Sequence, residues 1–320
     1  NIAVIGCGPW GKNLVRNFYE LNSLHSICDI DEKKVKFLQE KYKDLSFSYD
    51  YRQIMKNPQV KAVVISTPAS SHHQIVKEAL LADKDVFVEK PLALSYQEGE
   101  ELVALAEEKA RILMVGHVLE YHPAVIKLKE LVNTGELGNI KYIYSNRLNL
   151  GKFRTEENIL WSFAPHDISV ILDLLEEMPV EVSSHGANYL EPNISDVTIT
   201  TMSFPSGVKT HMFVSWLHPY KEQKLIVIGG RKMVMFDNVN TKGRLFLYSH
   251  KIDWIDRIPV PRPEDALPIE VEGKEPLRRE CEHFIECLMS RKSPKTAGWS
   301  GLRVLKVLEA CQESLRKNGK

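Results

Sequence analysis

A lysine stands where a buried strand would end, in the segment Val86-Phe-Val-Glu89-Lys90-Pro91. A residue that precedes proline is driven into an extended conformation, so Lys90 is expected to close the strand. Side chains alternate along a strand, so Glu89 and Lys90 are expected to point to opposite sides. A positioned amine of this kind can act as a general acid or base, whereas most lysines at strand ends are only solvated. The residues alone leave both interpretations open.

Three glycines could hold a phosphate group. Gly6, Gly8 and Gly11 follow an apolar strand directly and precede a helical pattern. In such a loop the first glycine allows a tight turn, the second lets the backbone approach a pyrophosphate, and the third lets helix and strand pack closely. The helix N-terminus adds free N–H groups and a partial positive charge. The loop, with Pro9 and Trp10 in it, therefore predicts a dinucleotide site.

Acidic residues follow the second predicted strand, in Cys28-Asp29-Ile30-Asp31. A carboxylate at this point binds the adenosine ribose hydroxyls and repels a 2′-phosphate, which favours NAD over NADP. We assign this role to Asp29, with Ile30 beside it, and interpret Asp31 as the cap of the next helix. Lys33 and Lys34 lie close by and would weaken the preference if one of them met a phosphate.

The segment Thr67-Pro68-Ala-Ser-Ser-His72 follows another strand. In open α/β sheets the ligand lies outside the carboxyl ends of the strands, so Thr67, Pro68 and His72 are predicted to line the dinucleotide together with Glu89 and Lys90. Ser70 and Ser71 serve equally well as simple helix caps.

The elements that must position these residues alternate between strand and helix in the first third of the chain, which indicates a parallel sheet with right-handed crossovers. Strands are predicted at 2–5, 26–30, 62–66, 86–89 and 113–115. From about residue 118 the pattern changes to a helix at 123–134, a strand at 140–149, a helix ending near 175 and successive strands up to 249, with final helices near 276–291 and 299–317. We predict a Rossmann domain over 1–118 and an α+β domain with a large, open, mostly antiparallel sheet over 119–320, whose last helix may return to the first domain.

A histidine in the second half is a further catalytic candidate. The segment from Trp161 to Leu175 predicts a helix in which His166 lies in the first turn, directly after Pro165. The helix dipole would favour a neutral imidazole there, as a base requires. A packing or capping role for His166 is equally consistent with the residues.

Several polar and aromatic side chains near strand ends could bind a substrate. Arginine offers a fork of donors to phosphate, and an aromatic face can stack on a base or a sugar ring. A solvated loop that makes a subunit contact is the alternative. His117 and His122 fit no common zinc spacing, and no metal site is predicted. The predicted substrate-binding residues are His117, Tyr121, Arg147, Asn149, Arg154, Trp161, His166 and Trp216.

The composition restricts the class of protein. The 320 residues contain 42 Lys+Arg and 42 Asp+Glu, so no charge excess favours nucleic acid or a membrane surface. No apolar run reaches the roughly 20 residues of a membrane helix, and no leader is evident, so we expect a cytoplasmic protein. Five cysteines without Cys-x-x-Cys spacing indicate reduced, mostly buried thiols.

Together these motifs resemble the Gfo/Idh/MocA (glucose-fructose oxidoreductase, inositol dehydrogenase, rhizopine catabolism) family over essentially the whole chain, with Glu89-Lys90-Pro91 the most specific element. The resemblance implies NAD(P)-dependent oxidation or reduction of a sugar or cyclitol hydroxyl, with Lys90 as the active-site lysine and either Lys90 or His166 carrying the proton. The family commonly has an aspartate one helical turn before this histidine, where this sequence has Ser162. An orienting partner for His166 would then be Asp167 or a residue from elsewhere.

The segments around Arg147, from Trp161 to His166 and around Trp216 resemble the branch that oxidises C3 of UDP-N-acetylglucosamine or its uronate. A dehydrogenase of free inositol or hexose is the alternative. The serine at position 162 also leaves open an NAD-binding sensor without chemistry. The open sheet predicts a homodimer or homotetramer with a small-molecule substrate.

Overall fold

The computed structural model describes residues 1–151, 153–155, 157–241 and 244–319. The chain forms two compact units. Unit 1 contains Asn1–Tyr121 and Lys274–Lys306, and unit 2 contains His122–Gly273 and the chain from Val307 onward. The C-terminal segment thus contributes to both units.

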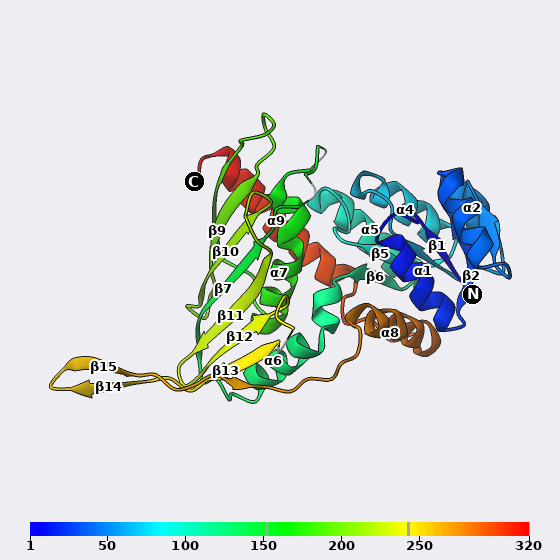
Figure 1. Ribbon diagram of the computed structural model, residues 1–320. Coiled ribbons are helices and arrows are strands. Elements are labelled where there is room, and N and C mark those ends of the chain that lie inside the picture. The colour runs from blue at the N-terminus through cyan, green and yellow to red at the C-terminus, as the bar shows by residue number, and fades with distance from the viewer. Residues whose placement is uncertain (152, 156, 242–243, 320) are drawn as a thin grey trace. The chain divides into compact units, whose positions relative to one another are not determined.

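Unit 1 is built on a six-stranded parallel sheet in the order β3-β2-β1-β4-β5-β6 (Figure 1). This is the order of a dinucleotide-binding doubly wound fold. The strands are β1 (Ile2–Ile5), β2 (Leu24–Cys28), β3 (Ser46–Ser48), β4 (Ala62–Ile65), β5 (Asp85–Glu89) and β6 (Leu113–Gly116). The helices are α1 (Gly11–Glu20), α2 (Glu32–Lys41), α3 (Tyr51–Lys56), α4 (His72–Leu81), α5 (Tyr96–Glu108), α8 (Pro276–Ser290) and the short 3-10 turns η1 (Ala69–Ser71) and η2 (Val118–Tyr121).

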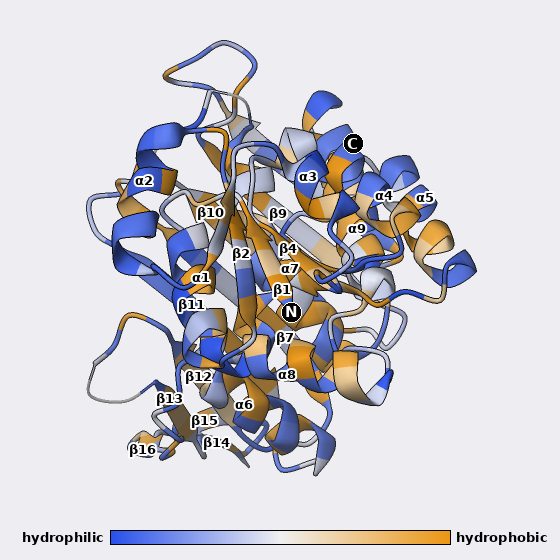
Figure 2. Cartoon of the chain, turned by 90° about the vertical axis from the view of Figure 1, so that its right-hand side faces the viewer, coloured by the Kyte–Doolittle hydropathy of each residue, from blue (hydrophilic) through white to orange (hydrophobic). Residues whose placement is uncertain are grey.

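The central strands of unit 1 form because they are continuous runs of apolar, largely β-branched residues that are buried on both faces. Every residue of β1 and β4 is buried, and these strands carry hydrophobic colours in Figure 2. None of the described helices is both long and apolar enough to cross a bilayer.

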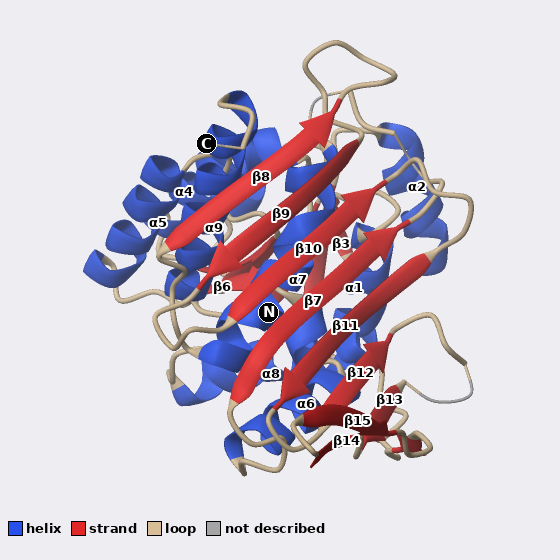
Figure 3. Cartoon of the chain, turned by 90° about the vertical axis from the view of Figure 1, so that its left-hand side faces the viewer, coloured by secondary structure: helices blue, strands red, loops and turns tan. Residues whose placement is uncertain are grey.

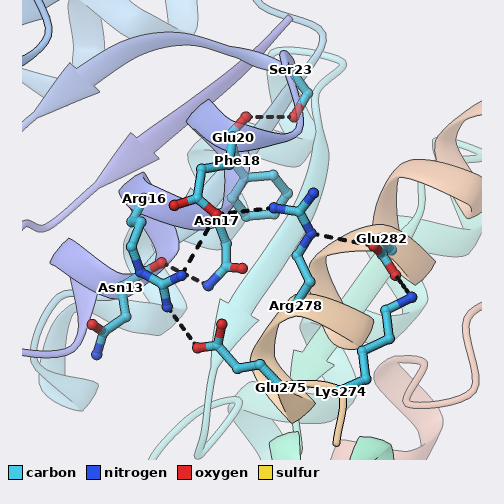
Figure 4. A network of polar contacts seen from close by, with 10 residues as sticks. All are labelled: Asn13, Arg16, Asn17, Phe18, Glu20, Ser23, Lys274, Glu275, Arg278 and Glu282. Atoms are coloured by element: carbon cyan, nitrogen blue, oxygen red, sulfur yellow. Dashed lines mark hydrogen bonds and ion pairs between the residues drawn. The ribbon is translucent and has the colours of Figure 1, made fainter.

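Helix α8 belongs to unit 1 although it lies far away in the sequence. Phe284 from α8 meets Phe18 and Phe87 edge-on, with ring centroids 6.3 and 5.6 Å apart. Ion pairs join its N-terminal end to α1 (Figure 4). The Arg16 guanidinium lies 2.6 Å from the Glu275 carboxylate, and that of Arg278 lies 3.2 Å from the Glu20 carboxylate. The apolar contacts decide this position, since exposed ion pairs contribute about 1 kcal/mol or less each.

Unit 2 carries an eight-stranded sheet in the order β16-β13-β12-β11-β7-β10-β9-β8. All neighbouring pairs are antiparallel except β7 and β10, which run parallel. The strands are β7 (Ile140–Leu148), β8 (Glu181–Ala187), β9 (Val197–Ser203), β10 (Lys209–Ser215), β11 (Glu222–Gly229), β12 (Met233–Asp237), β13 (Leu245–Tyr248) and β16 (Leu267–Pro268).

Helices cover one face of this sheet. Helix α7 (Ile159–Leu175) packs on β7, β9 and β10, and α6 (Pro123–Asn133) packs on β12. Alternate strand residues such as Ile143 and Val227 are fully buried on that side. The other face is open to the viewer in Figure 3, and no described element of unit 2 covers it.

The fold class predicted from the sequence is confirmed, and five features of the structure were not predicted. These are strand β3, helix α3, the parallel pairing of β7 with β10, strand β16, and a hairpin of β14 (Lys251–Ile255) and β15 (Ile258–Arg262). Helix α9 (Gly298–Arg316) is divided between the two units. All five cysteines are buried and free, as predicted.

Candidate active site

The glycine-rich loop has a geometry that only glycine can provide. Gly6 adopts φ +91°, and a Cβ there would lie 2.8 Å from the Ser66 backbone. A Cβ on Gly11 would lie 2.0 Å from the carbonyl oxygen of Gly6. Nothing lies within 4 Å of the position of a Cβ on Gly8. The loop is therefore closed where helix and strand must pack and open where a phosphate must approach.

The loop also contacts the strand that leads to Lys90. No side chain caps the N-terminus of α1 at Trp10. The Trp10 indole instead donates a 2.5 Å hydrogen bond from Nε1 to Oε1 of Glu89 at the end of β5. Pro9 is exposed, and Trp10 is 41% exposed. The dinucleotide loop and the catalytic candidate thus share one edge of the sheet.

Asp29 is fixed at the end of β2. Its carboxylate accepts hydrogen bonds from the backbone N–H of Cys7 at 2.6 Å and of Asp31 at 2.9 Å. Asp31 caps α2 by accepting from the Lys33 N–H, as predicted. Lys34 Nζ lies 3.6 Å from both the Asp29 and the Asp31 carboxylates. This lysine therefore already has anionic partners within unit 1.

Of three further predicted cofactor-binding residues near this edge, two are accessible to solvent and one is buried. Ile30 is 86% exposed and Pro68 is exposed, as a surface that contacts a nucleotide requires. His72 is 1% exposed, with Nδ1 2.8 Å from the carbonyl oxygen of Pro91 and Nε2 3.0 Å from that of Thr67. Burial lowers the pKa of His72, and a neutral ring can donate to only one of the two carbonyls. Its described contacts hold the loops after β4 and β5 together.

Lys90 is half-buried directly after β5, and the Lys90–Pro91 peptide is cis. Its ammonium group lowers the pKa values of Glu89, His72 and His117, so all three lie within its electrostatic reach. For Glu89 burial prevails over the opposing effects of Trp10 and Lys90 and raises the pKa to about 7. A carboxyl group that titrates near neutral pH thus adjoins the lysine, as is common at functional sites.

His117 follows β6 at the same edge and is 1% exposed. Burial, assisted by the charge of Lys90, lowers its pKa to about 3, so the ring is neutral. Neither ring nitrogen has a hydrogen-bond partner within the described chain. A buried imidazole of this kind requires a partner such as water or a ligand group.

Sequence reasoning missed a buried glutamate on α8. Glu280 is fully buried, and its carboxyl oxygens have no hydrogen-bond partner among the described residues. Burial, together with the charges of Glu89 and Glu120, raises its pKa well above the ordinary value. No sequence signal identifies it, because it lies on an ordinary amphipathic helix that joins unit 1 only through tertiary packing.

Tyr121 lies in the core of unit 1. It is 5% exposed, and its hydroxyl group is 3.1 Å from that of Thr296. We therefore do not retain Tyr121 as a substrate ligand.

In unit 2, His166 is half-buried on α7, but the prediction that it lies in the first helical turn was wrong. The helix begins at Ile159 with Asn158 as its cap, and Pro165 lies inside it. His166 is thus its eighth residue, counted from Ile159. The helix dipole acts within the first turn, so it gives no reason for a neutral ring here.

Arg147 and Asp167 form a buried ion pair between β7 and α7. The guanidinium group donates from Nε at 2.6 Å and from Nη2 at 3.0 Å to the two carboxylate oxygens. Asp167 is thereby engaged away from His166, since neighbouring helix residues do not face one another. Arg147 is 6% exposed, so we do not retain it as a phosphate ligand. Ser162, one turn before His166, is buried.

The other predicted substrate residues of unit 2 differ in accessibility. Trp216 is 1% exposed and donates from Nε1 to Asp196, so it belongs to the core. Trp161 is half-buried, with Nε1 3.1 Å from Gln312 Oε1. Arg154 is exposed, 3.6 Å from Glu157, and the half-buried Asn149 follows β7. Arg154, Asn149 and Trp161 are thus the accessible candidates.

The residues of unit 1 fit a dinucleotide. The open approach at Gly8 and the uncapped helix behind it suit a pyrophosphate, and Asp29 suits a ribose. A nicotinamide ring would lie near the ends of the strands that carry Lys90 and His117. The two ring nitrogens of His117, which have no hydrogen-bond partner in the described chain, could bind the nicotinamide or the substrate.

The chain is similar to known oxidoreductases in sequence and to solved structures in fold. The chain is 26% identical over 309 residues to scyllo-inositol 2-dehydrogenase (NAD(+)) of Bacillus subtilis, covering 91% of this chain and 87% of the relative. It is 22% identical over 303 residues to UDP-N-acetylglucosamine 3-dehydrogenase of Acidithiobacillus ferrooxidans, covering 94% and 93%. The solved structure of that kind of enzyme from the same organism, GnnA, superimposes with a TM-score of 0.87 at 20% identity over 99% of this chain and 97% of the other.

Two consecutive domain families also match. Residues 1–117 match the oxidoreductase family with the NAD-binding Rossmann fold, and residues 125–235 match the Gfo/Idh/MocA C-terminal domain. The protein therefore belongs to the Gfo/Idh/MocA family of oxidoreductases.

Proposed function

We propose that this protein transfers a hydride between NAD and a secondary hydroxyl group of a sugar, with Lys90 as the central catalytic residue. The observation that carries the proposal is the shared sheet edge in unit 1. The open glycine loop is joined to the end of β5 by the Trp10–Glu89 hydrogen bond, directly before Lys90. A cofactor held by the loop would therefore lie beside the lysine.

When bound, the oxidised nicotinamide supplies the hydride acceptor. Oxidation of the alcohol also releases the hydroxyl proton, which a protein group must take. Lys90 holds the substrate oxygen, and either its amine or the imidazole of His166 takes the proton. Glu89 balances the charge of Lys90 when its carboxyl group is ionised. Because the pKa of Glu89 is about 7, this ionisation occurs near neutral pH.

NAD is the proposed cofactor instead of NADP. Asp29 presents a carboxylate where a 2′-phosphate would lie, and Lys34 is already paired with Asp29 and Asp31. A D29A variant should lose preference for NAD over NADP, measured as the ratio of the two kcat/KM values. Equal use of both cofactors by the wild type would contradict this assignment.

The proposed substrate is a UDP-linked N-acetylamino sugar or its uronate, oxidised at C3. The exposed Arg154 offers donors for a diphosphate, and Trp161 and Asn149 offer a ring face and an amide for base or sugar. The likeness to a UDP-N-acetylglucosamine 3-dehydrogenase over 94% of the chain supports this choice. The likeness to an inositol dehydrogenase supports free inositol as the second candidate.

The experiment is NADH release, followed by absorbance, with UDP-N-acetylglucosamine, its uronate, myo-inositol and glucose. We expect turnover with a nucleotide sugar. Turnover with only the last two would favour the second candidate. NADH binding without turnover on any compound would indicate an NAD-binding sensor. An R154M variant should raise KM for the nucleotide sugar, whereas R262M, on the remote hairpin of unit 2, serves as the matched control.

A further inference from the structure

Helix α8 runs antiparallel to strand β5. Arg291, directly after the helix, binds Asp85 at the start of the strand at 2.7 Å. In the middle of both elements Phe284 packs on Phe87, with ring centroids 5.6 Å apart. The N-terminal half of α8 therefore lies along the end of β5 that leads to Lys90.

This arrangement places Glu280 on the side of the sheet to which Glu89 points. Side chains alternate along a strand, so Phe87 and Glu89 share one face of β5. Glu280 precedes Phe284 by one helical turn, so both side chains lie on the helix face that meets this strand. The Glu89 carboxyl group turns over the neighbouring strand, where a Cβ on Gly116 would lie 3.0 Å from its Cδ. The Glu89 and Glu280 side chains thus enter the same part of the interior of unit 1.

A third carboxyl group, that of Glu120, lies on the other side of Glu280. Glu120 is 2% exposed and belongs to η2, which packs on α8. Burial raises the pKa of Glu280, and the charges of Glu89 and Glu120 raise it further, so both carboxyl groups are close to it. Lys295 Nζ lies 3.7 Å from Glu120 Oε2, and 34% of the lysine side chain is exposed. A row of three carboxyl groups, Glu89, Glu280 and Glu120, thus leads from the end of β5 to the surface.

Glu280 has the properties of a proton carrier within this row. It is fully buried, and neither carboxyl oxygen has a hydrogen-bond partner among the described residues. A buried carboxyl group in this state lowers stability, so packing alone gives no reason for it. In its protonated form the group can accept a proton at one oxygen and release another from the second. Both oxygens of Glu280 are uncommitted, and buried water commonly completes such contacts.

The other titratable groups that face the row stay neutral. Burial raises the pKa values of Tyr121 and Cys281 well above their ordinary values. Burial lowers the pKa of His117, beside Lys90, to about 3. The carboxyl groups of the row are therefore the groups that can exchange a proton with Lys90 near neutral pH.

We propose that Glu280 is a proton-transfer residue and that the row of Glu89, Glu280 and Glu120 carries the proton of the reaction between Lys90 and solvent. This inference rests on the proposed function. In the direction of oxidation, the neutral amine of Lys90 takes the proton of the substrate hydroxyl group, and the resulting ammonium group passes it to the Glu89 carboxylate. Glu280 accepts that proton and releases its own to the Glu120 carboxylate, from which a proton enters solvent beside Lys295. One proton leaves for each hydride transferred, and the reverse sequence supplies it for reduction.

Stopped-flow measurement of NADH and of released protons tests this route, with the full chain in weak buffer that contains a pH indicator. In the wild type the proton should appear together with NADH. In E280Q, whose amide cannot carry a proton, kcat should fall about tenfold or more. The proton should then lag behind the NADH of the first turnover, while the Kd of NADH stays unchanged. The matched control is E286Q, on the same helix but with a side chain that is 76% exposed, and it should behave like the wild type.

A folded E280Q that releases protons in step with NADH, as E286Q does, would overturn the inference and leave the proposed function intact. If E280Q does not fold, E120Q decides in the same assay, because it interrupts the row at its outer end. Simultaneous release of NADH and protons by E120Q would then refute the route. A wild type that oxidises none of the four compounds would refute the proposed function, and this inference with it, since there would be no reaction proton to carry.

Discussion

Replacing Arg147 by methionine would leave Asp167 as an unpaired carboxylate in the core of unit 2. Asp167 is 2% exposed, and both of its oxygens accept hydrogen bonds from the guanidinium group in the native structure. The change tests whether Arg147 has a structural role or the phosphate-binding role predicted from the sequence.

The magnitude follows from burial. Removing one partner of a buried ion pair costs about 3–5 kcal/mol, whereas replacing both partners by apolar residues of similar volume is often neutral. We therefore expect R147M and D167L each to lower the free energy of unfolding by about 3–5 kcal/mol. The free energy of unfolding of the double variant R147M/D167L should lie within about 1 kcal/mol of that of the wild type. The coupling energy between the two residues would then be far larger than that of exposed ion pairs.

Hydrogen exchange of amides in α7 measures the change in the free energy of unfolding, because it reports on unit 2 without assuming that both units unfold together. R147K serves as the control: it keeps the charge but not the two-pronged geometry, and should fall between the wild type and R147M. R147M with unchanged protection of α7 would refute the reasoning. A stable double variant with a greatly raised KM for a nucleotide sugar would restore the phosphate-binding role.

Three further predictions concern unit 1. K90M should abolish turnover while the Kd of NADH stays near that of the wild type; full activity in steady-state assays would remove Lys90 from the mechanism. G8A should fold normally but bind NADH weakly, since its methyl group fills the approach to the phosphates. G11A should destabilise unit 1, because its Cβ would lie 2.0 Å from the carbonyl oxygen of Gly6. Calorimetry measures the loss of stability, and NADH titration measures the loss of binding. Burial raises the pKa of Glu89 from 4.5 to about 7, so its stabilising effect is fully present below pH 4.5 and is lost as the pH rises through 7. Relative to E89Q, the wild type should thus lose about 3 kcal/mol over this range in urea titrations, and parallel curves would contradict the shift.

The sequence was sufficient for elements whose residues have one pattern and one environment. The apolar strands of unit 1 and the helix over 123–134 were predicted because burial on both faces of a strand, or along one stripe of a helix, leaves a direct signal. The hairpin β14–β15 was missed because its turn, Asp256–Arg257, lacks glycine, and because Pro259 and Pro261 argue against a strand. Arg257 adopts φ 67° in that turn, a conformation that glycine would favour.

The site was predicted where local motifs define it and less well where tertiary partners do. Gly6, Gly8, Gly11 and the cap at Asp31 follow from spacing alone. Arg147 and Trp216 were interpreted as ligands because their types suit sugars and phosphates, but Asp167 and Asp196, which bind them, lie 20 residues away in each case. No local pattern reveals such pairs.

The position of Lys90 depends on contacts that the mechanism itself does not require. Trp10 from the glycine loop binds Glu89 on one side of the lysine in sequence, and His72 binds the carbonyl of Pro91 on the other. The backbone around Lys90 is therefore held from the loops after β1 and β4. A change in either loop should alter catalysis through the position of the amine, even if it leaves the amine itself unchanged. In the proposed mechanism, this arrangement would position the amine of Lys90, because the glycine loop and the lysine are parts of one hydrogen-bonded edge.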